Sequence, residues 1–141
     1  MNFIRKIVQS HSKEAAELHS ELIKLLNFSP GTINTYEKAF TYRSVQMTDL
    51  NGSVINYERL EFLGDSILGS VIAAYLYKKV PTGSEGYLTQ MRSKIVSREH
   101  LNELGKDLNL IRFVKSKIIQ SNVGDNIHGN IFEALIGAIY L

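Results

Sequence analysis

The sequence contains no cysteine and only two prolines among its 141 residues. The lack of cysteine excludes disulfide bonds, thiolate metal ligands and cysteine nucleophiles, and it is typical of a reducing interior, so we expect a cytoplasmic protein. Carboxylates remain as the main candidates for metal ligands. No apolar run approaches the roughly 20 residues of a membrane span, and the N-terminal segment lacks the long apolar stretch of a secretory signal. We therefore expect no membrane partner.

Charge of one sign is also not in excess. Sixteen Lys and Arg residues stand against fourteen Asp and Glu residues, which gives a net charge of only +2. Bulk electrostatics therefore do not identify a nucleic-acid binder, and any such function must come from local patches. A hydrophobic content of 44% over this length is enough for one compact domain, which we place at residues 1–141.

The sequence shows no internal repeat, no low-complexity tract and no clear alternation of apolar and polar residues. Apolar residues instead recur at helical spacing, which predicts an all-α fold. Ser84 is a candidate N-cap, and Gly105 is either a break or a close-packing point. We expect a polar loop at 47–56 and helices at 10–28, 33–45, 57–79, 86–110 and 127–141.

The segment NYERLEFLGDSIL, residues 56–68, places three acids in a stretch that otherwise suits a protein core. Glu58, Glu61 and Asp65 stand at i, i+3 and i+7, so on a helix they fall within one narrow stripe. Leucine, isoleucine and phenylalanine fill most of the remaining circumference, which favours packing on several sides. Like charges held this way repel one another, and a bound cation would relieve the repulsion.

The last predicted helix carries a second polar pair, Asn130 and Glu133, at i and i+3. If this face meets the acidic stripe, then Glu61, Asp65, Asn130 and Glu133 form an oxygen cluster of the kind that Mg²⁺ or Mn²⁺ prefers and zinc does not. For any one of these residues alone, a salt bridge or a capped loop is the simpler interpretation. The four together favour a metal site, with metal-activated water as the nucleophile.

The motif ERLEFLGDSIL closely resembles the signature of the ribonuclease III endonuclease domain. The resemblance extends through FTYRS, EGYLTQMRSKIVSREHLNELGKDLNL and GNIFEALIGAIYL, in the family's order, and covers roughly residues 15–141. It implies a homodimeric, all-helical domain that cleaves double-stranded RNA and leaves 5′-phosphate and 3′-hydroxyl ends. It also implies a Mg²⁺ cofactor, with Mn²⁺ as its substitute, no organic cofactor, and a role in processing ribosomal and messenger RNA.

The same resemblance assigns roles to individual residues. Glu61, Asp65 and Glu133 take the places of the catalytic and metal-binding acids, and Glu58 is better interpreted as second-shell support. Asn130 stands where the family usually has aspartate, which leaves one negative charge fewer and weakens the expected metal affinity. Tyr42 stands where the family often has histidine, and we expect only a local change in packing.

Several basic residues are candidates for contacts with RNA, although a solvated surface is an equally good interpretation of each. They are Arg92, Lys94, Arg98, Arg112, Lys115 and Lys117. His128 is two residues from Asn130 and therefore points about 200° away, so we expect a packed or exposed histidine and not a ligand. Glycines inside apolar helices, at positions 64, 69 and 137, suggest helix crossings or a dimer contact.

Two alternatives stay open from the sequence. Asn130 is the feature that would favour a catalytically impaired, ribonuclease III-like RNA-binding module. An unrelated carboxylate-bridged metal bundle is less favoured, because such bundles typically carry Glu-x-x-His pairs and EALI has no histidine at that spacing. The sequence stops at Leu141 inside an apolar helix without a terminating signal, so we expect a C-terminal truncation that removes a double-stranded RNA-binding domain.

Overall fold

The computed structural model describes residues 2–49, 51–117 and 124–141, within which lie six α-helices and one small sheet. The helices are α1 (Asn2–Leu26), α2 (Ile33–Ala39), α3 (Glu58–Lys79), α4 (Glu85–Ile95), α5 (Arg98–Asp107) and α6 (Ile127–Tyr140). Two 3-10 turns, η1 (Arg43–Val45) and η2 (Leu110–Phe113), connect them, and strand β1 (Met47–Thr48) pairs antiparallel with β2 (Val54–Ile55). The predicted all-α class is confirmed.

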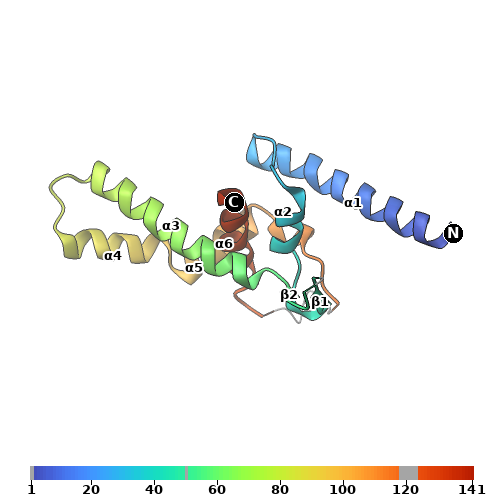
Figure 1. Ribbon diagram of the computed structural model, residues 1–141. Coiled ribbons are helices and arrows are strands. Elements are labelled where there is room, and N and C mark those ends of the chain that lie inside the picture. Colours follow the sequence, from blue (N-terminus) through green and yellow to red (C-terminus); the bar gives the residue numbers. More distant parts are fainter. Residues whose placement is uncertain (1, 50, 118–123) are drawn as a thin grey trace.

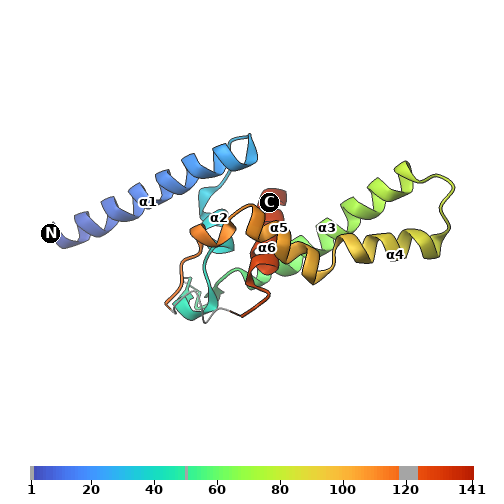
Figure 2. The same ribbon diagram turned by 180° about the vertical axis from the view of Figure 1, so that it is seen from behind.

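Helix α6 is the centre of the arrangement (Figure 1). It packs most extensively against α3, then against α5, and also contacts α2. Helix α1 projects from the α2 side of the body, while α3 and α4 form a hairpin that projects in the opposite direction (Figures 1 and 2). Much of α3 and α4 therefore lies outside the body of the molecule.

The hydrophobic core is built around α6 because this helix is apolar on nearly all sides. Ile131, Ala134 and Leu135 are fully or almost fully buried there. Burial of a side chain such as Ile131 contributes roughly 1.5–3 kcal/mol, so α6 fixes the positions of the helices around it. Its main partners in the core are Leu22, Tyr36, Phe40, Leu60 and Leu110.

Glycines let α3 and α6 approach each other at backbone distance. A Cβ atom added to Gly64 would lie 1.7 Å from the carbonyl oxygen of Glu133, and one added to Gly137 would lie 2.3 Å from that of Leu60. The two glycines therefore mark a helix crossing, as one of the two sequence interpretations expected. Gly69 has no atom within 4 Å of an added Cβ, so it does not belong to this crossing.

The single helix predicted for residues 86–110 is wrong, because the chain forms two helices there. The break falls between Ile95 and Arg98, where the Ser97 hydroxyl accepts a hydrogen bond from the His100 N–H at 3.3 Å and caps α5. Gly105, for which the sequence left open a break or a close-packing point, is a close-packing point: it lies inside α5, and a Cβ atom added to it would lie 2.2 Å from the carbonyl oxygen of His128 on α6. The predicted cap is correct, since the Ser84 hydroxyl accepts from the Tyr87 N–H.

The predicted helix at 33–45 is also too long, since α2 ends at Ala39. After it, the Lys115 N–H donates to the Phe40 carbonyl and the Tyr42 N–H donates to the Lys115 carbonyl, at 2.8 and 2.9 Å. This pairing with a segment more than 70 residues away draws the chain out of the helix. The predicted loop at 47–56 contains the β1–β2 hairpin, whose two-residue strands are too short to show alternation.

One expectation about membranes also needs correction. Helix α3 is long and apolar enough, by length and composition, to cross a membrane, although the sequence analysis found no such run. This is weak support for a span, because core helices of other proteins meet the same criterion. The helix meets it because it is rich in apolar side chains, and few of them are buried in this chain.

Candidate functional site

The crossing of α3 and α6 brings the predicted acidic residues together. Gly64 rests on the backbone of Glu133, and its helical neighbours Glu61 and Asp65 lie on the adjacent stripe of α3. The electrostatic interaction of Glu133 with both of these acids places all three carboxylates in one neighbourhood. Glu61 and Glu133 are half-buried, whereas Asp65 is exposed.

Burial and mutual repulsion make this group of carboxylates hard to ionise fully. Burial raises the pKa of Glu133 most, and the negative charges of Asp65 and Glu61 raise it further, to about 7. The pKa of Glu61 is also raised, mainly by burial and then by Glu58. Arg98 acts in the opposite direction on both. The site therefore carries negative charge that the protein itself does not fully compensate.

These donors suit a hard divalent cation. Three carboxylates and the amide oxygen of Asn130 are oxygen ligands of the type that Mg²⁺ and Mn²⁺ bind. A cation among them would favour the ionised form of Glu133 and remove the repulsion that raises its pKa. As the side chains of residues 12–49, 51–117 and 124–141 are placed, no three acidic or histidine groups are close enough to hold a metal ion. Binding would therefore require side-chain rotation.

Asn130 is held by an aromatic pair. Its side chain is hydrogen-bonded to that of Tyr57, which directly precedes α3. The Tyr57 ring stacks on Tyr42, with centroids 5.8 Å apart and planes at 19°, and both tyrosines are buried. The expected local packing role of Tyr42 is thus confirmed, and Tyr57 is a site residue that the sequence analysis missed although it borders the signature motif.

Asn102 is a second residue that the sequence analysis missed. Its side-chain oxygen accepts a hydrogen bond from the Gly129 N–H at 2.8 Å, and its amide donates to Asn126 at 3.1 Å. These bonds satisfy a free N–H in the first turn of α6 and fix that turn to α5. Since Asn130 and Glu133 follow directly, Asn102 sets where they lie. The sequence signal that could have identified Asn102 is its place directly after Leu101, an apolar residue of the predicted core face.

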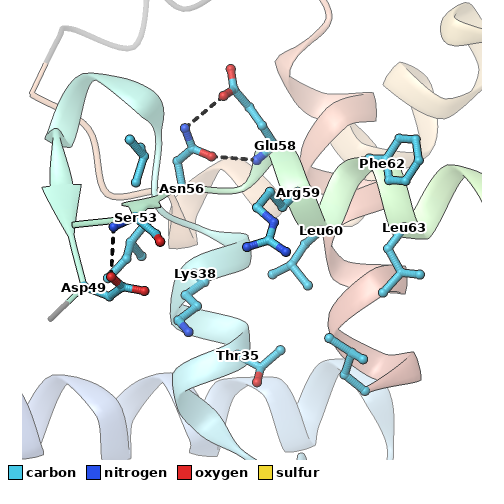
Figure 3. Close-up of a pocket in the computed structure, with 13 residues that line it drawn as sticks. Thr35, Lys38, Asp49, Ser53, Asn56, Glu58, Arg59, Leu60, Phe62 and Leu63 are labelled. Atoms are coloured by element: carbon cyan, nitrogen blue, oxygen red, sulfur yellow. Dashed lines mark hydrogen bonds between the residues drawn. The ribbon is translucent and has the colours of Figure 1, made fainter. Parts of the chain in front are cut away.

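Glu58 lies at the beginning of α3 and is tied to Asn56. The Asn56 amide donates to the Glu58 carboxylate at 2.9 Å, and the Glu58 N–H donates back to the Asn56 side-chain oxygen at 3.0 Å (Figure 3). This reciprocal pair satisfies the first N–H of the helix and holds the Glu58 side chain beside Asn56. The predicted supporting role of Glu58 fits this position, and its charge also contributes to the raised pKa of Glu61.

A larger hollow than the one beside Glu133 lies at a different place in the described chain. It measures about 740 Å³ and lies between α2, the β1–β2 turn and the start of α3. Lys38 and Arg59 point into it, Leu60 and Leu63 form an apolar wall, and Phe62 stands at its edge (Figure 3). None of the four predicted metal ligands lines it, although the supporting acid Glu58 does. Volume alone therefore does not mark the candidate site.

The six basic candidates divide into two groups. Arg112 lies 3.7 Å from Glu21 and stacks on Phe113, while Lys115 pairs with Glu14 and Glu37 at 3.2 and 3.7 Å. These two charges are directed toward α1 and α2. The other four side chains are exposed, and for them the predicted contact with RNA stays a prediction. They are Arg92, Lys94, Arg98 and Lys117.

His128 is not brought toward the carboxylates. Its Nδ1 atom is buried without a hydrogen-bond partner, and burial lowers its pKa. The expectation of a packed histidine therefore fits the structure.

Comparison with known proteins tests the family resemblance of the sequence independently of this geometry. A family model described as the Ribonuclease III domain matches residues 58–141. Two proteins named Ribonuclease 3, from Zunongwangia profunda and Flavobacterium psychrophilum, are 64% and 60% identical to this chain over its full length. In both cases the chain spans only 58% of the length of the relative.

Solved structures agree with the fold. The nuclease domain of ribonuclease III from Campylobacter jejuni, described with a region involved in dimer formation, superposes with a TM-score of 0.72 at 30% identity. The match covers 84% of this chain and 82% of that one. Dicer from Pichia stipitis gives a TM-score of 0.58 at 32% identity, covering 77% of this chain and 45% of its own.

Proposed function

The chain belongs to the ribonuclease III family, and from this premise we propose that it is the catalytic part of an endoribonuclease that cleaves double-stranded RNA with the help of Mg²⁺. Mn²⁺ would substitute for Mg²⁺. The products carry 5′-phosphate and 3′-hydroxyl ends, and the activity serves processing of ribosomal and messenger RNA in the cytoplasm. The observation that carries the proposal is the group of carboxylates at the α3–α6 crossing, with the pKa of Glu133 raised to about 7.

The residues at the crossing divide the work. Glu61, Asp65, Glu133 and Asn130 would hold the cation, which when bound would polarise a phosphate oxygen and make water more acidic for in-line attack. Asn102 keeps Glu133 opposite α3 by fixing the first turn of α6. Tyr57 keeps Asn130 in one orientation. These two residues fix the backbone and one ligand, so that only the acidic side chains need to rotate toward the cation.

Recognition of the duplex would rely on its backbone. Proteins that bind double-stranded RNA contact phosphates and 2′-hydroxyl groups across the shallow minor groove, because the deep major groove does not admit side chains. Exposed cations on α4 and α5, such as Arg92 and Lys94, are suited to such contacts and carry no base readout. We therefore propose weak sequence specificity.

Membership in the family excludes the unrelated carboxylate-bridged bundle. The impaired RNA-binding module stays as the second candidate, because Asn130 supplies one negative charge fewer than aspartate. We favour the active enzyme, since the three carboxylates are all present and Asn130 keeps a side-chain oxygen at the site.

Cleavage of a long RNA duplex at low salt, in Mg²⁺ and separately in Mn²⁺, tests the proposal. The wild-type chain is expected to cut, and Asn130→Asp to reach half its maximal rate at a Mg²⁺ concentration on the order of tenfold lower, because it adds a charged ligand. Asn34→Asp, the same change at an exposed position on α2, is the matched control and should behave as the wild type. Cutting by Asn130→Asp alone would mean a disabled chain, and RNA binding without cutting by either would favour the binding module.

We also propose that the working unit is a homodimer that buries much of α3. Phe62, Val71, Tyr75 and Tyr77 are all exposed, and Phe62 is 77% exposed. Helical spacing puts Phe62 and Val71 on opposite sides of α3, so exposed apolar side chains cover much of the circumference outside the acidic stripe. Such helices are buried in their working state, and a second copy would supply the missing cover. The Campylobacter jejuni nuclease domain, with its dimer-forming region, supports this.

Phe62 provides a test of the dimer. Phe62→Ser is expected to weaken self-association by at least about 100-fold, since each subunit loses a large aromatic contact. The serine adds no charge beside Glu61, and the exposed position leaves the monomer fold intact. Sedimentation equilibrium measures the effect, with Phe28→Ser, a 46% exposed phenylalanine just after α1, as the control. A wild-type chain that stays monomeric at high concentration would contradict the proposal.

A further inference from the structure

Arg98 occupies an unusual position for a basic residue. It is the first residue of α5, and Ser97 caps the helix in front of it. A positive charge in the first turn is opposed by the helix dipole, so the stability of α5 does not explain it. The adjoining turns of α5 are fixed on α6 through Gly105 and through the bond from Gly129 to Asn102. The backbone at Arg98 is thus held at a set place relative to α6.

That place borders the candidate metal site. Arg98 lines a small hollow together with Asn102, Asn130 and Glu133. Figure 2 shows α5 lying along α6 between the body and the α3–α4 hairpin. A third helix therefore contributes a cation beside acids that come from the other two.

The charge of Arg98 acts on those acids without a close ion pair. It counteracts the raised pKa of both Glu61 and Glu133, yet Arg98 takes part in none of the close ion pairs among the described residues. Its side chain is exposed. The guanidinium thus lies within electrostatic range of the site and keeps its donors available for a ligand.

We propose that Arg98 is an active-site residue with two opposing effects: its guanidinium binds an RNA phosphate beside the acidic cluster, and its charge lowers the affinity of that cluster for a divalent cation. The inference rests on the proposed function, because it presupposes an RNA duplex at the α3–α6 crossing. A planar guanidinium suits a phosphate, which it binds through two parallel hydrogen bonds. The same fixed charge repels a cation at short range.

The two effects predict changes of opposite sign on removal of the charge. Arg98→Gln is expected to bind Mn²⁺ several-fold more tightly and RNA several-fold more weakly, with the slope of log affinity against log salt concentration reduced by about one. Arg98→Lys keeps the charge and loses the fork, so it should bind Mn²⁺ as the wild type and RNA less well. Lys94→Gln, an exposed cation in the last turn of α4, should weaken RNA binding and leave Mn²⁺ binding unchanged.

Mn²⁺ binding is measured on the protein without RNA. RNA binding is measured in metal-free buffer. Mn²⁺ binding is followed by electron paramagnetic resonance of the free ion, and binding of a short RNA duplex by fluorescence anisotropy over a range of salt. Equal Mn²⁺ affinity of Arg98→Gln and wild type would overturn the electrostatic effect, and an unchanged salt slope would overturn the phosphate contact. A wild-type chain that binds neither Mn²⁺ nor duplex would overturn the proposed function itself, which separates the two failures.

Discussion

Gly64→Ala is expected to lower the free energy of unfolding by about 3 kcal/mol or more, beyond the usual range for one added methyl group in a core. The new Cβ atom would lie 1.7 Å from the carbonyl oxygen of Glu133 and 2.9 Å from the backbone nitrogen of Gly137. Both are backbone atoms of α6, so no side-chain rotation relieves the overlap. The two central helices must separate, and thermal unfolding followed by circular dichroism should show a loss of roughly 10 °C.

Gly69→Ala on the same helix is the matched control. It adds the same methyl group in open space, since no atom lies within 4 Å of the added Cβ. Because alanine favours the helix over glycine by about 1 kcal/mol, this variant should be as stable as the wild type or more stable. Equal effects of the two substitutions would mean that α3 and α6 do not meet at backbone distance. A loss of cleavage in Gly64→Ala at a temperature where it is folded would show that the crossing also sets the spacing of the carboxylates.

The residues of the candidate site were predictable because helical periodicity places them without knowledge of the tertiary fold. The spacing of Glu61 and Asp65 on one helix, and of Asn130 and Glu133 on another, is fixed by 3.6 residues per turn. The sequence also shows acidic residues within apolar helices. These acids form one candidate cation site when the two helix faces meet. The structure brings these faces together at Gly64.

The remaining features depend on contacts between segments far apart in the chain. The backbone of Lys115 pairs with residues 40–42 and keeps them from continuing α2. Its side chain binds Glu14, 101 residues away in the sequence. Asn102 holds Gly129 across 27 residues. No sequence pattern near Lys115 or Asn102 indicates these bonds. In the sequence, each residue is equally well interpreted as part of a solvated surface. The break before α5 is different, because Ser97 was a visible capping residue there, whereas Gly105 turned out to be a close-packing point and not a break.

Two departures from the family pattern turn out to be connected. Tyr42 and Asn130 are 88 positions apart and appeared independent in the sequence. Tyr57 links them, since it stacks on Tyr42 and is hydrogen-bonded to Asn130. The identity of residue 42 thus bears on the orientation of residue 130, and an aspartate introduced at 130 would meet Tyr57 and not solvent alone.

Glu133→Gln is expected to lower cleavage by more than about 100-fold, since it removes a charged ligand, whereas loss of mere supporting residues around a metal typically costs 10–100-fold. The same variant should be more stable than the wild type in metal-free buffer at pH 8. The wild type must hold Glu133 ionised there, against burial and the charges of Asp65 and Glu61. Glutamine has a similar shape and no charge, so this destabilisation disappears.

The pH dependence gives the sign of the effect. Glu133 has a pKa of about 7 in the folded chain and an ordinary value of 4.5 in the unfolded chain, so between these values the folded state binds more protons than the unfolded state. Wild-type stability without metal should therefore decrease as pH rises from about 4.5 to 7 and then level off, and Glu133→Gln should lack this part of the decrease. Glu17→Gln, an exposed acid on α1, is the control and should retain it.

Addition of Mg²⁺ at pH 8 separates an electrostatic burden from a binding site. An ion that binds only the folded wild type raises its unfolding temperature, and glutamine at 133 should remove most of that rise. A variant that is more stable without metal, gains little from Mg²⁺ and does not cut would show that the acids are kept at the crossing for the cation. If Mg²⁺ instead stabilised Glu133→Gln as much as the wild type, the ion would bind elsewhere. Glu133 would then be a buried acid without a ligand role.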